Sequence, residues 1–233
     1  MRGKIKPEVH GHRGSPLRFP ENSLPGFIDA IEAGAGFIEL DVQASRDFEL
    51  FVSHDPHLPT GQLIHSLAAG AVPGCPTLAD VLDLSARFSG FGFNIEIKSY
   101  PDRPEYGPPP DQMARLVLDC IRERRLEQRV LVQSFDFRVL HAMQALDPSI
   151  ELSALWEGRR RDFAGIAAEA RTRCVSLHYS LIDSAAVRAA HDAGVRVLAW
   201  TVNGRDAWLR MMAAGVDGII TDDPAGLIQF LKT

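Results

Sequence analysis

Cysteine is scarce in this 233-residue chain, where Cys75, Cys120 and Cys174 are widely spaced and odd in number. No CxxC pair or Cys/His cluster accompanies them, which argues against a disulfide framework or a structural zinc site. The chain also lacks an excess of positive charge, with 25 Lys and Arg against 30 Asp and Glu. Since no basic run is interleaved with aromatic residues either, we expect no nucleic-acid partner.

Long apolar runs are absent as well. No stretch approaches the ~18 apolar residues of a membrane span, so we expect no membrane insertion. The first 14 residues carry positive charges without an apolar core, which is not the pattern of a signal peptide, and we expect a reducing, cytoplasmic location. The remaining composition, 45% hydrophobic and 24% charged, is that of a globular protein. The length suits one domain over residues 1–233.

Short apolar runs alternate with longer helical patterns, which is typical of βαβ units and a parallel sheet. The predicted strands are Glu8–Gly11, Phe37–Val42, Leu50–Ser53, Phe93–Lys98, Val130–Ser134, Glu151–Leu155, Cys174–His178, Arg196–Val202 and Gly218–Thr221. The connection Gln43–Glu49 is too short for a parallel crossover, so Leu50–Ser53 is expected to form a hairpin. Eight βα units remain. The pattern therefore predicts a (β/α)₈ TIM barrel with a short β-hairpin insertion after the second barrel strand.

Capping residues mark the predicted helices. Asn22 or Ser23 is expected to cap a helix that ends at Gly34, and Thr77 to cap Leu78–Arg87. The other predicted helices are Asp111–Arg125, Asp136–Leu146, Asp162–Arg171, Ser184–Ala193, Arg205–Ala214 and Pro224–Leu231.

Charged residues recur at every second position on two predicted barrel strands. Glu39 and Asp41 share one face of FIELDV, and Glu96 and Lys98 share one face of NIEIKS. Their apolar neighbours would face the helices, so the charges belong inside the barrel. Oxygen ligands on rigid strands suit Mg²⁺ or Ca²⁺. The pattern predicts a divalent-cation site of Glu39, Asp41 and Glu96, with an ion-free carboxylate–lysine network as the alternative.

Two histidines end predicted strands beside this cluster. His12 follows the first strand and His54 follows the hairpin strand. A histidine pair next to a cation can take a proton from an attacking oxygen and give one to a leaving oxygen. Arg13 adds a cationic fork suited to phosphate oxygens. Together with Lys98, these residues indicate a site for a phosphate ester.

Other polar or aromatic residues are expected at the same ends of the strands. Trp200 could form an apolar wall of the site or pack in the core. His178 ends another strand and could line the pocket. Asp222 and Asp223 are expected to cap the last helix.

These residues lie in stretches that resemble the glycerophosphodiester phosphodiesterase family. The stretches, in the family's order, are GHRGSPLRFPENSLPGFIDAIEAGA, FIELDVQASRD, FVSHDP, PTLADVL, NIEIKS, VLVQSF, AWTVN and GVDGIITDDP. The resemblance implies hydrolysis of a small-molecule glycerophosphodiester to glycerol 3-phosphate and an alcohol, assisted by Ca²⁺ or Mg²⁺. It implies that His12 and His54 form an acid/base pair. It also implies that Arg13 and Lys98 contact the phosphate, and that Glu39, Asp41 and Glu96 bind the metal.

The chain departs from the family's pattern in two places. Asp47-Phe48 stands where the hairpin usually has Asp-Gly, so the turn near His54 is expected to differ. Only 20 residues separate Asp55 from Pro76, where the family often carries a much longer lid. This suggests a more open site, partly covered by the proline-rich loop Tyr100–Pro110, which can continue neither a strand nor a helix.

Three alternatives fit parts of the pattern. His10 and His12 match the metal-binding HxH pattern of amidohydrolases. That family also needs a bridging carboxylated lysine, but Lys98 lies on the third rather than the fourth barrel strand. A lysophospholipase D or sphingomyelinase D-like enzyme could use the same barrel, usually with a disulfide and secretion. A non-catalytic sugar-phosphate binder would have no use for the pair His12 and His54. The leaving alcohol, the preferred ion, the attacking group and the acid and base assignments stay open.

Overall fold

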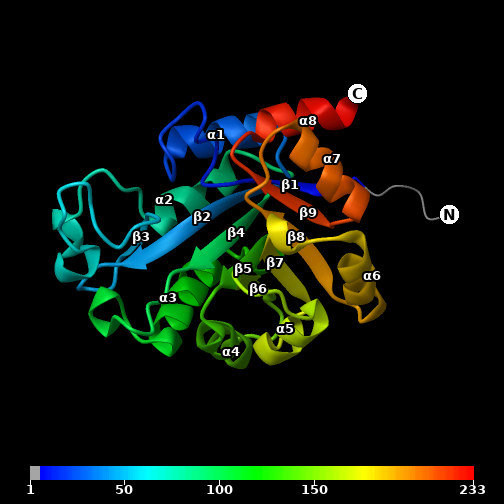
Figure 1. Ribbon diagram of the computed structural model, residues 1–233. Coiled ribbons are helices and arrows are strands. Elements are labelled where there is room, and N and C mark those ends of the chain that lie inside the picture. The colour runs from blue at the N-terminus through cyan, green and yellow to red at the C-terminus, as the bar shows by residue number, and fades with distance from the viewer. Residues whose placement is uncertain (1–5) are drawn as a thin grey trace.

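The computed structural model describes residues 6–233, and among them eight parallel strands close into a barrel surrounded by helices (Figure 1). The barrel strands are β1 (Glu8–Gly11), β2 (Phe37–Ala44), β4 (Gly92–Ile97), β5 (Val130–Ser134), β6 (Glu151–Trp156), β7 (Cys174–His178), β8 (Arg196–Trp200) and β9 (Gly218–Thr221). Strand β1 pairs in parallel with both β2 and β9, which closes the barrel. The predicted (β/α)₈ architecture is confirmed.

The hairpin insertion is confirmed as well. Strand β3 (Leu50–Val52) pairs antiparallel with the end of β2, with Gln43 opposite Phe51. At the turn, Phe48 adopts the left-handed conformation at φ 68° that a glycine would take. For a residue with a Cβ this conformation costs about 1–2 kcal/mol. The hairpin therefore forms without the glycine.

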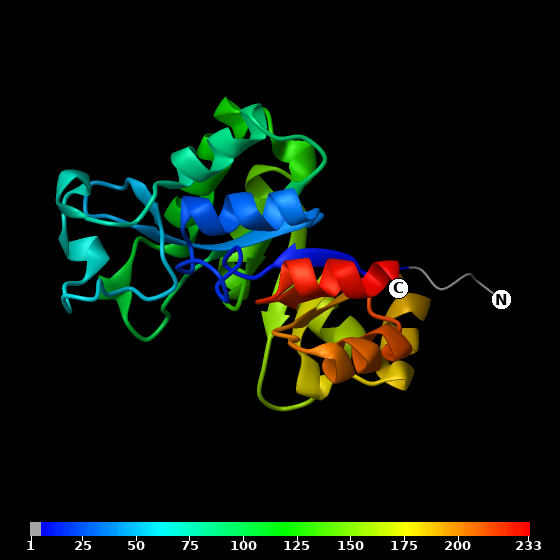
Figure 2. The ribbon, with the colours of Figure 1, turned by 90° about the horizontal axis from the view of Figure 1, so that it is seen from above.

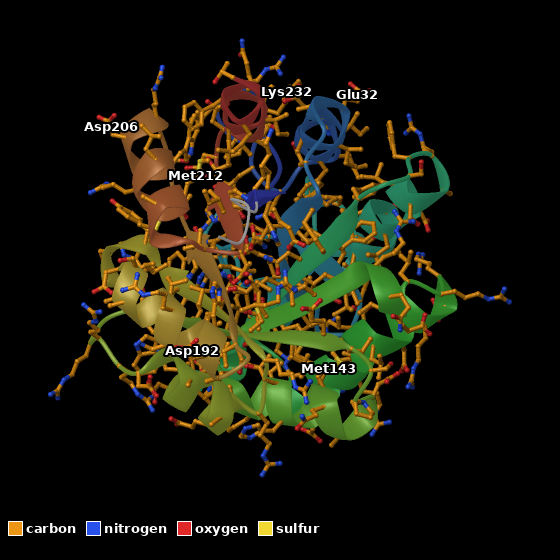
Figure 3. The ribbon with its side chains drawn as sticks, turned by 90° about the vertical axis from the view of Figure 1, so that its right-hand side faces the viewer. Glu32, Met143, Asp192, Asp206, Met212 and Lys232 are labelled. Atoms are coloured by element: carbon orange, nitrogen blue, oxygen red, sulfur yellow. The ribbon has the colours of Figure 1, made fainter. Side chains whose placement is uncertain are left out.

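The helices are α1 (Leu24–Ala33), α2 (Leu78–Leu82), α3 (Pro110–Glu123), α4 (Phe137–Leu146), α5 (Phe163–Ala170), α6 (Ser184–Asp192), α7 (Arg205–Ala214) and α8 (Pro224–Lys232). Figure 3 looks along the barrel and shows labelled residues of α1, α4, α6, α7 and α8 arranged around the strands. Ser23 rather than Asn22 caps α1, accepting a hydrogen bond from the Gly26 N–H. Helix α2 ends earlier than predicted, because the chain tightens into a 3₁₀ turn over Asp83–Ala86.

Apolar residues form two layers, one between the strands and the surrounding helices and one inside the barrel. The outward-facing Ile38, Leu40 and Val42 of β2 are fully buried beneath the helices, as the alternation predicted. Inside the barrel, Leu131 and Leu198 form a small apolar cluster with neighbouring side chains. The polar inward-facing residues described below lie beyond this cluster, toward the carboxyl ends of the strands. Burial of the apolar layers stabilises the frame that holds them.

Two segments extend beyond the carboxyl ends of the strands. The segment from His54 to Pro76 contains 3₁₀ turns at Ile64–Ser66 and Ala69–Ala71, and the proline-rich loop contains one at Pro104–Tyr106. They lie side by side at the left of Figure 2.

None of the described helices is both long and apolar enough to span a membrane. The expectation about a signal peptide concerns residues 1–14, of which residues 1–5 lie outside the described part of the chain.

Candidate active site

Three carboxylates project into the barrel from neighbouring strands. Glu39 and Asp41 alternate along β2, and Asp41 lies opposite Glu96 in the register with β4. All three side chains are buried, and one oxygen from each lies within 4.8 Å of the others. The structure thus brings together the three residues predicted as metal ligands.

Two cationic side chains partly neutralise this cluster. The Lys98 ammonium nitrogen lies 2.6 Å from a Glu96 oxygen and 2.9 Å from an Asp41 oxygen. The Arg13 Nε lies 3.4 Å from the other Asp41 oxygen. Two positive groups against three carboxylates leave a net negative charge at the cluster when all of them are ionised.

Burial and the neighbouring charges shift the pKa values of the three carboxyl groups in different directions. Burial, reinforced by the charges of Asp41 and Glu39, raises the pKa of Glu96 to about 7 although Lys98 opposes it. Burial and the charge of Asp41 raise the pKa of Glu39 to about 6. Burial also acts on Asp41, but Lys98 and Arg13 outweigh it and hold its pKa at about 2. Hard oxygen donors with uncompensated charge fit a divalent cation such as Mg²⁺ or Ca²⁺.

A tight turn after β1 places Arg13 at the cluster. Arg13 has a positive φ of 51°, and its backbone N–H donates to a Glu39 oxygen at 2.9 Å. Gly14 follows with a φ of 89°, and a Cβ there would meet the backbone of Gly26 at 2.7 Å. The His-Arg-Gly sequence therefore needs its glycine so that the turn can pack against α1. The Arg13 guanidinium is held at the cavity by Glu21, 2.9 Å away.

Two residues that hold the carboxylates were not predicted to do so. Asn22, considered as a helix cap, instead donates from its side-chain amide to Asp41 at 2.9 Å. Gln133 on β5 donates to the other oxygen of Glu39 at 3.2 Å. The stretches PENS and VLVQSF contain these residues, but their spacing along the chain gives no sign of either contact.

His12 pairs with a carboxylate that was expected only to cap a helix. The ring Nδ1 of His12 lies 2.6 Å from an Asp222 oxygen. Asn203 donates to the other Asp222 oxygen at 2.6 Å, and its own carbonyl accepts from the Asp222 backbone N–H. Burial by itself lowers the pKa of His12, but Asp222 and Glu39 outweigh it and raise the pKa above its ordinary value. Only Asp223 caps α8, so the prediction for Asp222 was wrong.

His54 reaches the same site from the hairpin. Its side chain is 37% exposed, and its Nδ1 lies 2.8 Å from the carboxylate of Asp55. Burial and the nearby charge of Lys98 lower the pKa of His54. The two histidines therefore differ in electrostatic environment, with that of His12 the more strongly negative.

A cavity of about 190 Å³ lies above the cluster. Seven of the eight predicted site residues line it, namely His12, Arg13, Glu39, His54, Glu96, Lys98 and Trp200. The Trp200 ring meets Phe135 edge-on at 5.6 Å and forms an apolar wall. His178 contacts Trp200 but does not line the cavity.

His10 lies outside this cavity. Its ring is fully buried inside the barrel and stacks on Phe37 at 4.6 Å. An HxH metal site of His10 and His12 is therefore not formed, which removes the amidohydrolase alternative.

Known proteins are similar to this chain over most of its length. The model of the glycerophosphoryl diester phosphodiesterase family matches residues 12–61 and 60–226. A glycerophosphodiester phosphodiesterase of Caldanaerobacter subterraneus is 33% identical over 98% of this chain and 99% of its own length.

Solved structures share the fold. A glycerophosphodiester phosphodiesterase of Parabacteroides distasonis superposes with a TM-score of 0.85 at 25% identity, covering 99% of this chain and 100% of its own. A phosphodiesterase of Oleispira antarctica, solved with its product sn-glycerol-3-phosphate, has a TM-score of 0.86 at 22% identity and covers 97% of each chain.

Proposed function

Because this chain belongs to the glycerophosphoryl diester phosphodiesterase family and is a phosphodiesterase, we propose that it hydrolyses glycerophosphodiesters to glycerol 3-phosphate and an alcohol with the help of a divalent cation. The observation that carries the proposal is the meeting of three buried carboxylates and two histidines at one cavity. The product bound by the Oleispira relative supports a small glycerol phosphate ligand. The whole chain, residues 1–233, is proposed to form one catalytic domain.

In the proposed mechanism, Glu39, Asp41 and Glu96 would hold the cation, which would neutralise charge on the non-bridging phosphate oxygens. Arg13 and Lys98 contact the same phosphoryl group and stabilise the charge that develops on it.

Proton transfer is assigned to the two histidines. His12, oriented by a carboxylate on its Nδ1, takes the proton of the attacking hydroxyl, which belongs to water or to the substrate's own glycerol. His54 donates a proton to the departing alkoxide.

The activity can be tested by following release of glycerol 3-phosphate from glycerophosphocholine and glycerophosphoethanolamine in Mg²⁺, Ca²⁺ or EDTA. We expect release that depends on the cation and stops with EDTA. Phosphorus NMR of the products separates direct hydrolysis from a cyclic phosphate intermediate. No release from either substrate with any ion would overturn the proposal.

Cation binding is expected to weaken as the pH falls below about 7. Glu96 and Glu39, with pKa values near 7 and 6, must lose their protons before they can act as ligands. Each bound proton that the cation must displace lowers the apparent affinity by up to about tenfold per pH unit. Calorimetric titration of Mg²⁺ or Ca²⁺ between pH 5 and 8, in two buffers of different ionisation enthalpy, measures the affinity and the protons released. An affinity independent of pH would contradict this prediction.

Replacing Asp222 by asparagine is expected to lower the pKa of His12, because the carboxylate that favours the charged ring is lost. The limb of the pH–kcat profile that belongs to His12 should move to lower pH, whether His12 acts as base or acid. We expect kcat to fall about 10–100-fold at its optimum. Asp217→Asn is a matched control, since Asp217 pairs with His191 at 2.9 Å away from the cavity. An unchanged pH profile in Asp222→Asn would show that Asp222 does not raise the pKa of His12.

A further inference from the structure

The proline-rich loop is connected to His54 by a chain of hydrogen bonds through Gln43. Gln43 is the inward-facing residue that follows Asp41 on β2, and its side chain is only 3% exposed. Its amide nitrogen donates to the backbone carbonyl of His54 at 3.0 Å and to the hydroxyl of Tyr100 at 2.7 Å. Both N–H bonds of the amide are therefore used, one by the His54 carbonyl and one by the Tyr100 hydroxyl.

The backbone of His54, more than its ring, is firmly held. The ring contacts Asp55, which is 75% exposed, and such an exposed pair contributes little. The peptide, by contrast, is held on both sides by β2. The Ser53 N–H donates to the Asp41 carbonyl at 3.0 Å, and the His54 carbonyl accepts from Gln43. The position of the ring over the cavity therefore depends on these backbone contacts.

Tyr100 in turn is held by packing within the loop. Its ring meets Tyr106 edge-on at 5.3 Å, and Tyr106 meets His57 at 5.2 Å. The prolines of the loop restrict its φ angles, so little conformational entropy is lost in holding this arrangement. The loop therefore packs against the segment that follows His54, and the two segments lie side by side in Figure 2.

We propose that Tyr100 and Gln43 are positioning residues for His54, so that the proline-rich loop completes the active site through the Tyr100 hydroxyl. The inference rests on the proposed function, since it assigns a task to the loop in the same reaction. A proton donor must lie within hydrogen-bond reach of the leaving oxygen, and a displacement of about 1 Å can cost on the order of 100-fold in rate. Neither residue needs to touch the substrate for this role.

The test compares Tyr100→Phe and Gln43→Leu with Tyr106→Phe as the matched control in the same loop. Tyr100→Phe keeps the ring and removes only the hydroxyl, so the loop should still fold. We expect kcat for glycerophosphocholine to fall about tenfold in each of the first two variants, with KM changed less than twofold. Tyr106→Phe should behave as the wild type.

Combination with His54→Ala distinguishes positioning from a general structural effect. When Tyr100→Phe is added to His54→Ala, the residual kcat should stay within twofold, because the group that Tyr100 positions is gone. Hydrolysis of the p-nitrophenyl ester of glycerol 3-phosphate should be nearly unaffected in Tyr100→Phe, because this leaving group needs no proton.

Three results would overturn the assignment while leaving the proposed function intact. They are wild-type kcat in Tyr100→Phe, a loss confined to KM, or an equal tenfold loss in the wild-type and His54→Ala backgrounds. If Gln43→Leu does not fold, the kcat values of Tyr100→Phe and of its double variant with His54→Ala are sufficient to test the positioning role. Failure of the wild-type protein to release glycerol 3-phosphate would overturn the proposed function itself, and the positioning role with it.

Discussion

Replacing His12 by asparagine is expected to lower kcat for glycerophosphocholine by about 10²–10⁴-fold, the range attributed to a positioned acid or base. Asparagine keeps a polar group near the ring Nδ1, where it can still hydrogen-bond with Asp222, but it cannot accept and release the proton. Because His12 is not among the cation ligands, binding of Mg²⁺ or Ca²⁺ should be nearly unchanged. Steady-state kinetics and calorimetric cation titration measure the two effects.

The matched control is His191→Asn, which removes a histidine paired with Asp217 on the outside of the barrel. It should retain wild-type kcat. Activity within tenfold of wild type in His12→Asn would show that His12 is not the proton-transfer group. An equal loss of cation affinity would instead assign His12 to the cation site.

Replacing Glu96 by glutamine is expected to have opposite effects on activity and stability. Loss of one anionic ligand should weaken cation binding and lower kcat by about 10³-fold, since a bound cation supplies several kcal/mol of charge stabilisation. The near-isosteric amide still accepts a hydrogen bond from Lys98. Activity assays at saturating and limiting cation, with Glu32→Gln on the outer face of α1 as control, measure the loss.

The stability effect depends on pH because the pKa of Glu96 is raised in the folded state from 4.5 to about 7. Its contribution to stability is fully present below pH 4.5 and is lost as the pH rises to about 7. Without cation, Glu96→Gln should therefore be more stable than the wild type at pH 8, with the difference shrinking toward pH 5. Thermal unfolding in EDTA at both pH values tests this. A lower melting temperature in the variant at pH 8 would contradict it.

Local sequence patterns were sufficient to predict which strands carry the residues of the site. Alternation with a period of two placed Glu39 and Asp41 on one face of β2 and Glu96 and Lys98 on one face of β4. The apolar residues between them had to face the helices, because burial of apolar surface stabilises the fold. The ends of strands marked His12 and His54, and a βα repeat of this length indicated a barrel. These features depend only on neighbouring residues and therefore appear in the sequence.

The contacts that orient these groups depend on closure of the barrel. His12 and Asp222 are 210 residues apart in the chain and meet because β1 pairs with β9. The hydrogen bond between Gln133 and Glu39 joins residues 94 positions apart across the barrel interior. No helical or strand periodicity relates such pairs.

The tertiary structure also determines whether a residue near a helix N-terminus caps the helix or hydrogen-bonds to a side chain of the active site. Asn22 and Asp222 are both residue types that favour helix N-termini, and each lies next to the residue that forms the cap. Each instead turns toward a charged group in the barrel, where a buried hydrogen bond to an ionised partner is worth more than a second cap. The barrel, the carboxylate cluster and the two histidines could be predicted from local sequence patterns. Only the folded chain decided which side chains orient them, because that depends on which strands become neighbours when the barrel closes.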